Sequence, residues 1–136
     1  GSLIQQLSNE LPNFKEKLLP YSSRLRFLFC DERYVPLDHQ DCTYFGFLKQ
    51  NLFQMLDVKT DNVLRINPDL TLDECAQDYE NRFRDLLNSR NGFDILLLGI
   101  GPDGHTCSLF PEHESFINCC QDSATRARLV IPVRNL

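Results

Sequence analysis

The chain has 136 residues, of which 42% are hydrophobic and 24% charged, values typical of a folded globular domain rather than a disordered chain. Fourteen basic and nineteen acidic residues give a net charge of −5, which disfavours nucleic acids and anionic membranes as partners. The sequence has no apolar window near the roughly 18 residues of a membrane span and no secretory signal pattern. We therefore expect one cytoplasmic domain over residues 1–136.

Helical and extended patterns alternate along the chain. The first half of the chain predicts a helix over Leu3–Leu11 ended by Pro12, a short helical turn around Phe14–Leu19, a strand over Leu25–Cys30, and a helix over Tyr44–Leu56. The second half predicts a strand over Val63–Ile66, a helix opened by the capping box Thr71-x-x-Glu74, a central strand over Ile95–Leu98, and a last strand over Leu129–Val133. This alternation predicts an α/β fold with a mainly parallel sheet covered by helices on both faces.

The six cysteines form no C-x-x-C pair and no set with zinc-ligand spacing. Most of them lie within or beside apolar segments. We expect reduced, buried thiols and no metal site.

The segment Phe93–Pro111 carries the strongest functional signal, because a buried strand runs into a turn rich in glycine. Glycines 99, 101 and 104 match the dinucleotide-binding spacing literally. That motif should open a long helix, whereas Phe110-Pro111 interrupts here and Pro102 removes a backbone donor. The pattern favours another use, in which glycine lets a ligand approach the backbone closely.

His105 lies within this turn and is the side chain there that titrates near neutral pH, so it is a candidate general base. Asp103 is expected to fix the turn by accepting backbone hydrogen bonds. A purely structural histidine is the alternative. A Cys107–His105 nucleophile pair is disfavoured, because such near neighbours rarely have the required geometry.

Charged residues also follow the predicted strand Leu25–Cys30, where Asp31-Glu32-Arg33 would stand at its carboxyl end. Such ends face the ligand crevice in open α/β sheets. Arg33 suits a phosphate or carboxylate, and Asp31 suits a hydroxyl or a proton. A solvated turn with its own ion pair is the alternative.

Two segments together resemble a known family. CDERYVPLDHQDCTY (Cys30–Tyr44) and FDILLLGIGPDGHTCSLFPEH (Phe93–His113) are similar to the signature regions of 6-phosphogluconolactonase, within the superfamily that includes glucosamine-6-phosphate isomerase/deaminase. The stretch INPDLTLDECAQDYENRFR also resembles that family. The continuation Thr-Cys-Ser-Leu-Phe-Pro favours the lactonase branch.

The resemblance implies a Rossmann-like fold and hydrolysis of 6-phospho-D-glucono-1,5-lactone to 6-phosphogluconate in the pentose phosphate pathway, without a cofactor or metal. The residues it implies are His105 as general base, Asp31 as the active-site aspartate, and Arg33, Gly1, Ser2, Gly101, Asp103 and Gly104 in substrate binding. Gly1-Ser2 has the alternative of a cloning remnant. The turn amides or Arg33 would stabilise the oxyanion.

The family pattern extends beyond both ends of this sequence, which keeps open a non-catalytic remnant that binds a sugar phosphate. The isomerase/deaminase activity of the sister branch is a further alternative. The partner in the leading hypothesis is a phosphorylated sugar lactone, bound by a monomer.

Overall fold

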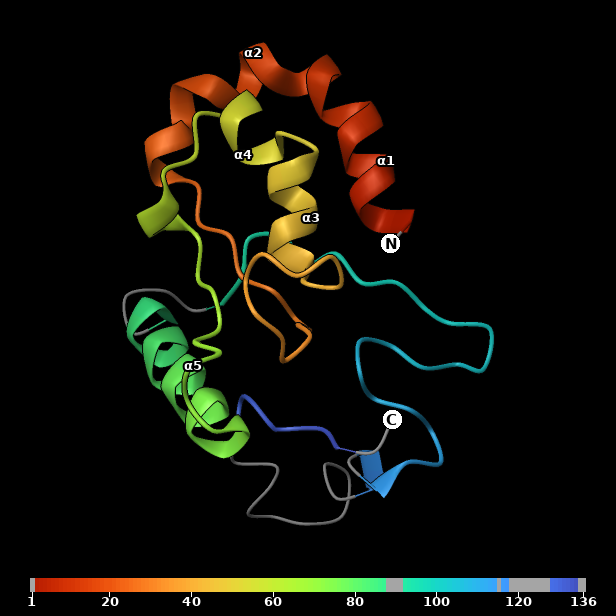
Figure 1. Cartoon of the computed structure of the whole chain (residues 1–136). Helices are drawn as coiled ribbons and strands as arrows, with labels where there is room; N and C mark the ends of the chain where they lie inside the picture. The colour runs from red at the N-terminus through yellow and green to blue at the C-terminus, as the bar shows by residue number, and fades with distance from the viewer. Residues whose placement is uncertain (1, 88–91, 115, 118–127, 135–136) are drawn as a thin grey trace. The chain divides into compact units, whose positions relative to one another are not determined.

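The structure is a computed structural model that describes residues 2–87, 92–114, 116–117 and 128–134. It divides into two compact units, Gly1–Pro68 and Asp69–Leu136. The regular elements of the described residues are helices (Figure 1). Among these residues, no helix combines the length and the apolar character needed to cross a membrane.

The first unit begins with short helices, and Pro12 and Pro20 each lie in the first turn of a 3₁₀ helix that follows an α-helix. Its elements are α1 (Ser2–Glu10), η1 (Leu11–Phe14), α2 (Lys15–Leu18), η2 (Leu19–Arg24), α3 (Thr43–Lys49), α4 (Leu52–Met55) and η3 (Thr60–Asn62). Pro12 stands in the first turn of the 3₁₀ helix η1, because its ring fits there but not in the interior of an α-helix. The prediction that the first helix ends at Pro12 is confirmed.

The predicted single helix over Tyr44–Leu56 is wrong, because the chain breaks it into α3 and α4. Asn51 separates them with a left-handed backbone at φ 54°. Asparagine tolerates this conformation, which cannot continue a right-handed helix. The apolar spacing continues across the break, since α3 and α4 face the same core.

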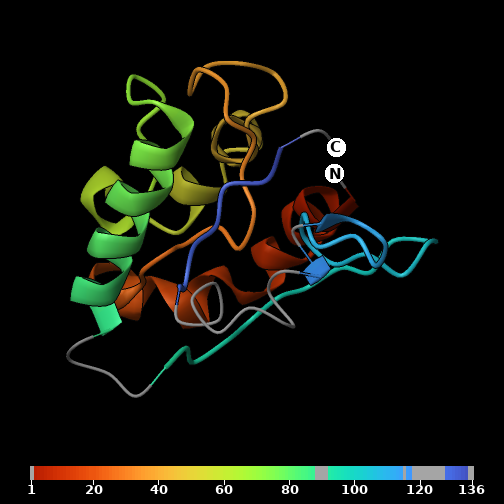
Figure 2. The same cartoon turned by 90° about the horizontal axis from the view of Figure 1, so that it is seen from below.

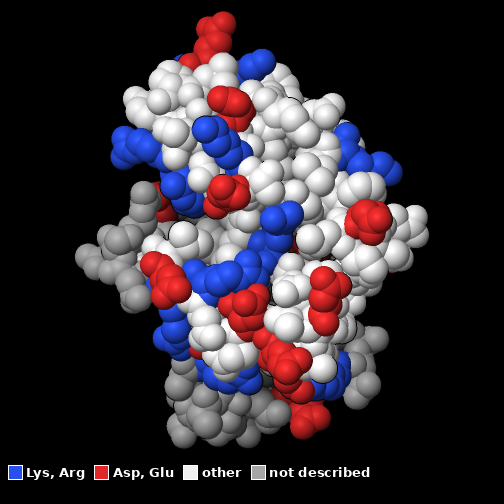
Figure 3. All heavy atoms as spheres, turned by 60° about the vertical axis from the view of Figure 1, so that its left-hand side comes forward, with Lys and Arg blue, Asp and Glu red and all other residues white. Residues whose placement is uncertain are grey.

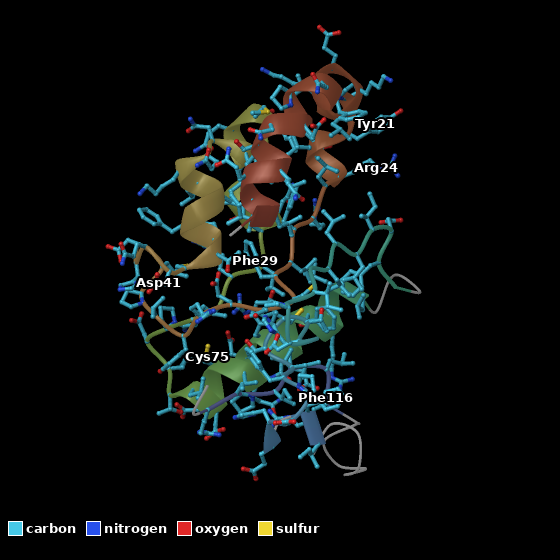
Figure 4. The ribbon with its side chains drawn as sticks, turned by 90° about the vertical axis from the view of Figure 1, so that its right-hand side faces the viewer. Tyr21, Arg24, Phe29, Asp41, Cys75 and Phe116 are labelled. Atoms are coloured by element: carbon cyan, nitrogen blue, oxygen red, sulfur yellow. The ribbon has the colours of Figure 1, made fainter. Side chains whose placement is uncertain are left out.

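An aromatic core holds the first unit together. The rings of Phe47 and Phe53 stack at 5.5 Å, and Phe27 and Phe29 meet them edge to face. Phe29 lies near the N-terminal end of α3 (Figure 4), where it also meets the ring of Tyr44. The buried cluster consists of Cys42, Tyr44, Phe47, Leu52, Phe53 and Val63.

The strands predicted over Leu25–Cys30 and Val63–Ile66 do not form, but their pairing begins. Phe27 and Val63 make an isolated parallel bridge. The N–H of Phe27 donates to the carbonyl of Asn62 at 2.9 Å, and the N–H of Leu64 donates to the carbonyl of Phe27 at 2.8 Å. The predicted parallel direction is therefore present, while the ladder that defines a strand does not extend beyond one pair.

The second unit is built on α5 (Leu72–Leu87), and its predicted capping box is confirmed. The carboxylate of Glu74 accepts from the N–H of Thr71 at 3.1 Å and from its hydroxyl at 2.6 Å. The hydroxyl and backbone N–H of Thr71 hold the pKa of Glu74 below its ordinary value. The capping box therefore fixes where α5 begins.

Glu80 of α5 is a buried charged residue. Burial raises the pKa of this carboxyl, but hydrogen bonds from Arg84 and from the backbone of Leu129 and Val130 outweigh that effect, and the pKa is lowered. Arg128 lies 3.7 Å from its second oxygen. Ion pairs with Arg84 and Arg128 thus offset the burial of this charge.

Residues 128–134 run as an irregular trace (Figure 2) in place of the predicted last strand, and Arg128 and Arg134 contact acidic side chains of α5. Arg134 donates to Asp73 at 2.6 Å, near the start of the helix. Arg82 pairs with Asp78 one helical turn away. Figure 3 shows basic and acidic side chains close together on the face in view, as expected for a surface of mixed charge.

The predicted central strand over Ile95–Leu98 is also absent, and its apolar side chains are exposed. Ile95 is 76% exposed and Ile100 81%. The segment runs as an extended trace (Figure 1). A parallel strand needs hydrogen-bonding neighbours and helices on both faces. Within the described residues this segment has no strand partner, so the pattern that predicts burial is not satisfied.

Candidate active site

The centre of the candidate site is the pair His105 and Asp103. Nδ1 of His105 lies 2.5 Å from Oδ1 of Asp103, and this hydrogen bond holds the pKa of the Asp103 carboxyl below its ordinary value. The histidine side chain is 30% exposed and the aspartate side chain 53%. The pair is therefore open to a ligand from solvent.

The hydrogen bond defines which nitrogen of His105 can act as a base. An ionised carboxylate accepts, so Nδ1 carries the hydrogen and Nε2 of the neutral ring carries the lone pair. Among the described residues, Nε2 has no hydrogen-bond partner. The arrangement can therefore take a proton from a water molecule at Nε2 while Asp103 stabilises the resulting cation.

The glycines of the turn have distinct structural roles. The N–H of Gly101 donates to the carbonyl of His105 at 2.8 Å, and the N–H of Gly104 donates to the carbonyl of Gly101 at 3.0 Å. Gly104 has φ +88°, a conformation that favours glycine. Because both amides bond within the turn, neither is available to an oxyanion in this conformation.

Gly101 also provides space for the histidine ring. A Cβ at this position would lie 2.2 Å from Cε1 and 2.3 Å from Nδ1 of His105. Both distances are far below van der Waals contact, so only glycine allows the ring to rest there. The sequence predicts that a ligand approaches the backbone closely at such a glycine. In the structure, the group that approaches Gly101 is the His105 ring of the same turn.

Glu32 has a structural role in the first unit that the sequence pattern does not indicate. Its carboxylate accepts from the N–H of Thr43 at 2.6 Å and of Tyr44 at 2.9 Å, the first residues of α3. It also accepts from the N–H of Arg33 at 2.8 Å. Glu32 therefore caps α3.

The predicted site residues fall into two groups. His105, Asp103, Gly101 and Gly104 lie together in one turn of the second unit. Half-buried Asp31 and exposed Arg33 belong to the first unit, so a crevice shared with His105 stays a prediction. Ser2 begins α1, and Gly1 lies outside the described residues.

Two other observations bear on the expected chemistry. A surface pocket on α5 is lined by Asn81, Arg84, Asp85, Leu87 and Leu129, none of which is a predicted site residue. In the described part of the chain, no three His, Cys, Asp or Glu side chains are grouped to hold a metal ion.

The cysteines partly follow the prediction. Cys42 and Cys75 are buried reduced thiols, whereas Cys30 is an exposed reduced thiol. Cys119 and Cys120 lie outside the described residues.

Comparison with known proteins assigns the chain to a family. Residues 1–135 match the family model described as glucosamine-6-phosphate isomerases/6-phosphogluconolactonase. The chain belongs to this family. It is 40% identical to 6-phosphogluconolactonase of Homo sapiens over 148 aligned positions, which cover 99% of this chain and 57% of the human protein. The resemblance inferred from the sequence is confirmed, and the chain spans about half the length of such relatives.

Solved structures support the fold assignment. The crystal structure of 6-phosphogluconolactonase from Thermotoga maritima matches with a TM-score of 0.57 and 30% identity, over 74% of this chain and 45% of that one. The Plasmodium vivax 6-phosphogluconolactonase matches with a TM-score of 0.59 and 31% identity, over 66% and 30%. The arrangement of this chain is therefore similar to part of these folds, although its described residues form no strands.

Proposed function

We propose that the protein hydrolyses 6-phospho-D-glucono-1,5-lactone to 6-phosphogluconate, as a step of the pentose phosphate pathway. The observation that carries this proposal is the Asp103–His105 hydrogen bond, which leaves Nε2 open within a turn of a family member. The human relative, which carries the name 6-phosphogluconolactonase, aligns with 99% of the chain.

In the proposed reaction, Nε2 of His105 takes a proton from water as its oxygen attacks the lactone carbonyl carbon. The carbonyl becomes a tetrahedral oxyanion. When it collapses, the bond between that carbon and the ring oxygen breaks, and the imidazolium returns the proton to the leaving oxygen. Asp103 stabilises the imidazolium between these steps, because its carboxylate faces Nδ1.

The other site residues are assigned by what their chemistry suits. Because the amides of Gly101 and Gly104 bond within the turn, we assign the oxyanion to the guanidinium of Arg33. Asp31 would orient a substrate hydroxyl, and Gly1-Ser2, at the start of α1, would hold the phosphate. No metal or organic cofactor enters this mechanism.

The biological setting follows from the same proposal. We take residues 1–136 as part of one domain of a monomeric protein. Among the described residues, Cys30, Cys42, Cys75 and Cys107 are reduced thiols, which suits a reducing compartment, and we propose the cytoplasm.

Two alternatives compete with this proposal. The family description includes glucosamine-6-phosphate isomerases, so ammonia release from glucosamine 6-phosphate is the competing activity. The other alternative is a protein that binds the sugar phosphate without turnover. Calorimetry with 6-phosphogluconate would detect such binding.

The test uses freshly generated lactone, with the spontaneous hydrolysis rate subtracted. We expect hydrolysis above this background, and a loss of roughly 10²-fold or more in kcat for His105→Asn. The matched control is His39→Asn, because His39 is an exposed histidine of the first unit. Hydrolysis that survives His105→Asn unchanged would contradict the proposed base.

A further inference from the structure

The histidine ring of the site has a second neighbour besides Asp103. The ring of Phe110 stacks on that of His105, with centroids 4.3 Å apart and planes inclined by 25°. Gly101 adds a third contact, because its backbone leaves no room for a Cβ beside the ring. The imidazole is thus enclosed by three residues of one turn.

Backbone hydrogen bonds bring Phe110 back to His105. Thr106 and Leu109 form an antiparallel bridge, in which the N–H of Leu109 donates to the carbonyl of Thr106 at 3.0 Å. Cys107, between them, has a left-handed backbone at φ 54°. The hydroxyl of Thr106 also donates to the carbonyl of Gly99 at 3.0 Å. These bonds reverse the chain directly after His105, so that residue 110 reaches the ring.

The two side-chain contacts restrict different motions of the imidazole. A hydrogen bond at Nδ1 fixes one atom of the ring but leaves rotation about that contact. A stacked ring fixes the plane, because rotation would separate the two faces. Asp103 and Phe110 together therefore define both the position and the direction of Nε2.

We propose that Phe110 is a positioning residue, which holds the plane of His105 so that Nε2 points at the attacking water. The proposal rests on the proposed role of His105 as general base. It assigns a function to Phe110-Pro111, which the sequence analysis used only as evidence against a long helix. A misdirected base would lower kcat and leave substrate binding nearly unchanged.

The test combines two variants with nuclear magnetic resonance of the histidine rings in the full chain. Phe110→Leu keeps an apolar side chain without the ring, and Phe110→Tyr restores it. The control is Phe14→Leu, which changes an exposed phenylalanine of the first unit. The chain has three histidines, so His105→Asn identifies the signal of His105 by its disappearance.

We expect the Hε1 signal of wild-type His105 to lie upfield of those of His39 and His113, because it lies over an aromatic ring. It should move downfield in Phe110→Leu and stay upfield in Phe110→Tyr and in the control. We expect kcat to fall roughly 10-fold or more in Phe110→Leu with little change in KM, and Phe110→Tyr to recover it.

A wild-type signal without the upfield shift would overturn the proposal directly, and this measurement needs no variant to fold. A lost stack with unchanged kcat would also overturn it, while a large effect of His105→Asn would leave the proposed function standing. If His105→Asn has no effect on hydrolysis, the proposed function fails, and the positioning role fails with it even where the stack is present.

Discussion

The carboxylate of Glu32 carries a prediction about stability that can be worked out from its contacts. One oxygen accepts from the N–H of Thr43 and the other from the N–H of Tyr44. Glu32→Gln keeps one oxygen and replaces the second with an NH₂ group, which is a donor. Either orientation of the amide therefore places a donor opposite one of the first N–H groups of α3.

The expected cost has two parts. A lost hydrogen bond to a charged acceptor is worth about 1.5–3 kcal/mol. Removing a negative charge from a helix N-terminus adds about 0.3–1 kcal/mol. Since Glu32 is only half-buried, water recovers part of this loss, and we expect the free energy of unfolding to fall by about 2 kcal/mol.

Urea unfolding followed by far-UV circular dichroism measures this change. The matched control is Glu112→Gln, an exposed glutamate in a turn of the second unit, which should leave the free energy of unfolding nearly unchanged. Hydrogen exchange gives the local readout, since the amides of Thr43 and Tyr44 should exchange faster in Glu32→Gln. Unchanged stability together with slow exchange at both amides would refute the assignment of Glu32 as the cap.

Three further predictions concern Asp103, Gly101 and Cys42. Asp103→Asn should lower kcat by roughly 10²-fold or more, because the amide cannot stabilise the imidazolium as a carboxylate does; activity equal to wild type in the lactone assay would exclude that role. Gly101→Ala should displace the His105 ring, since the new Cβ would lie 2.2 Å from Cε1, and an unmoved Hε1 signal would contradict this. Burial raises the pKa of the Cys42 thiol, with a smaller contribution from the charge of Glu32. The contribution of the neutral thiol to the free energy of unfolding is therefore fully present below the unfolded thiol's pKa of about 8.5, and it is lost as pH rises through the pKa of the folded state. The urea concentration at the unfolding midpoint should be lower at pH of about 10 than at pH of about 8, because these values lie on either side of that pKa. The difference should be smaller in Cys42→Ala.

The sequence predicts those features whose causes lie within a few residues. The capping box depends on Thr71 and Glu74, three positions apart, and the end of the first helix depends on Pro12 alone. The helix break at Asn51 is different, because a left-handed residue leaves the apolar spacing on either side intact. The cap by Glu32 spans eleven positions to Thr43 through a loop, and no local pattern indicates it.

The contrast between local and distant contacts also applies to the candidate site and the predicted sheet. The hydrogen bonds and the ring contact described above for the His105 turn, from the Gly99 carbonyl to the Phe110 ring, join residues at most seven positions apart. Pairing of the preceding run Ile95–Leu98 would depend on partners far along the chain, and in the described residues that run has none. A turn that closes on itself does not need the ladder in order to hold its histidine. The sheet would instead have to set where that histidine stands relative to Asp31 and Arg33, which belong to the first unit. Under the proposed function, activity would therefore need two separable conditions, the local contacts of the His105 turn and a fold that brings Asp31 and Arg33 to it.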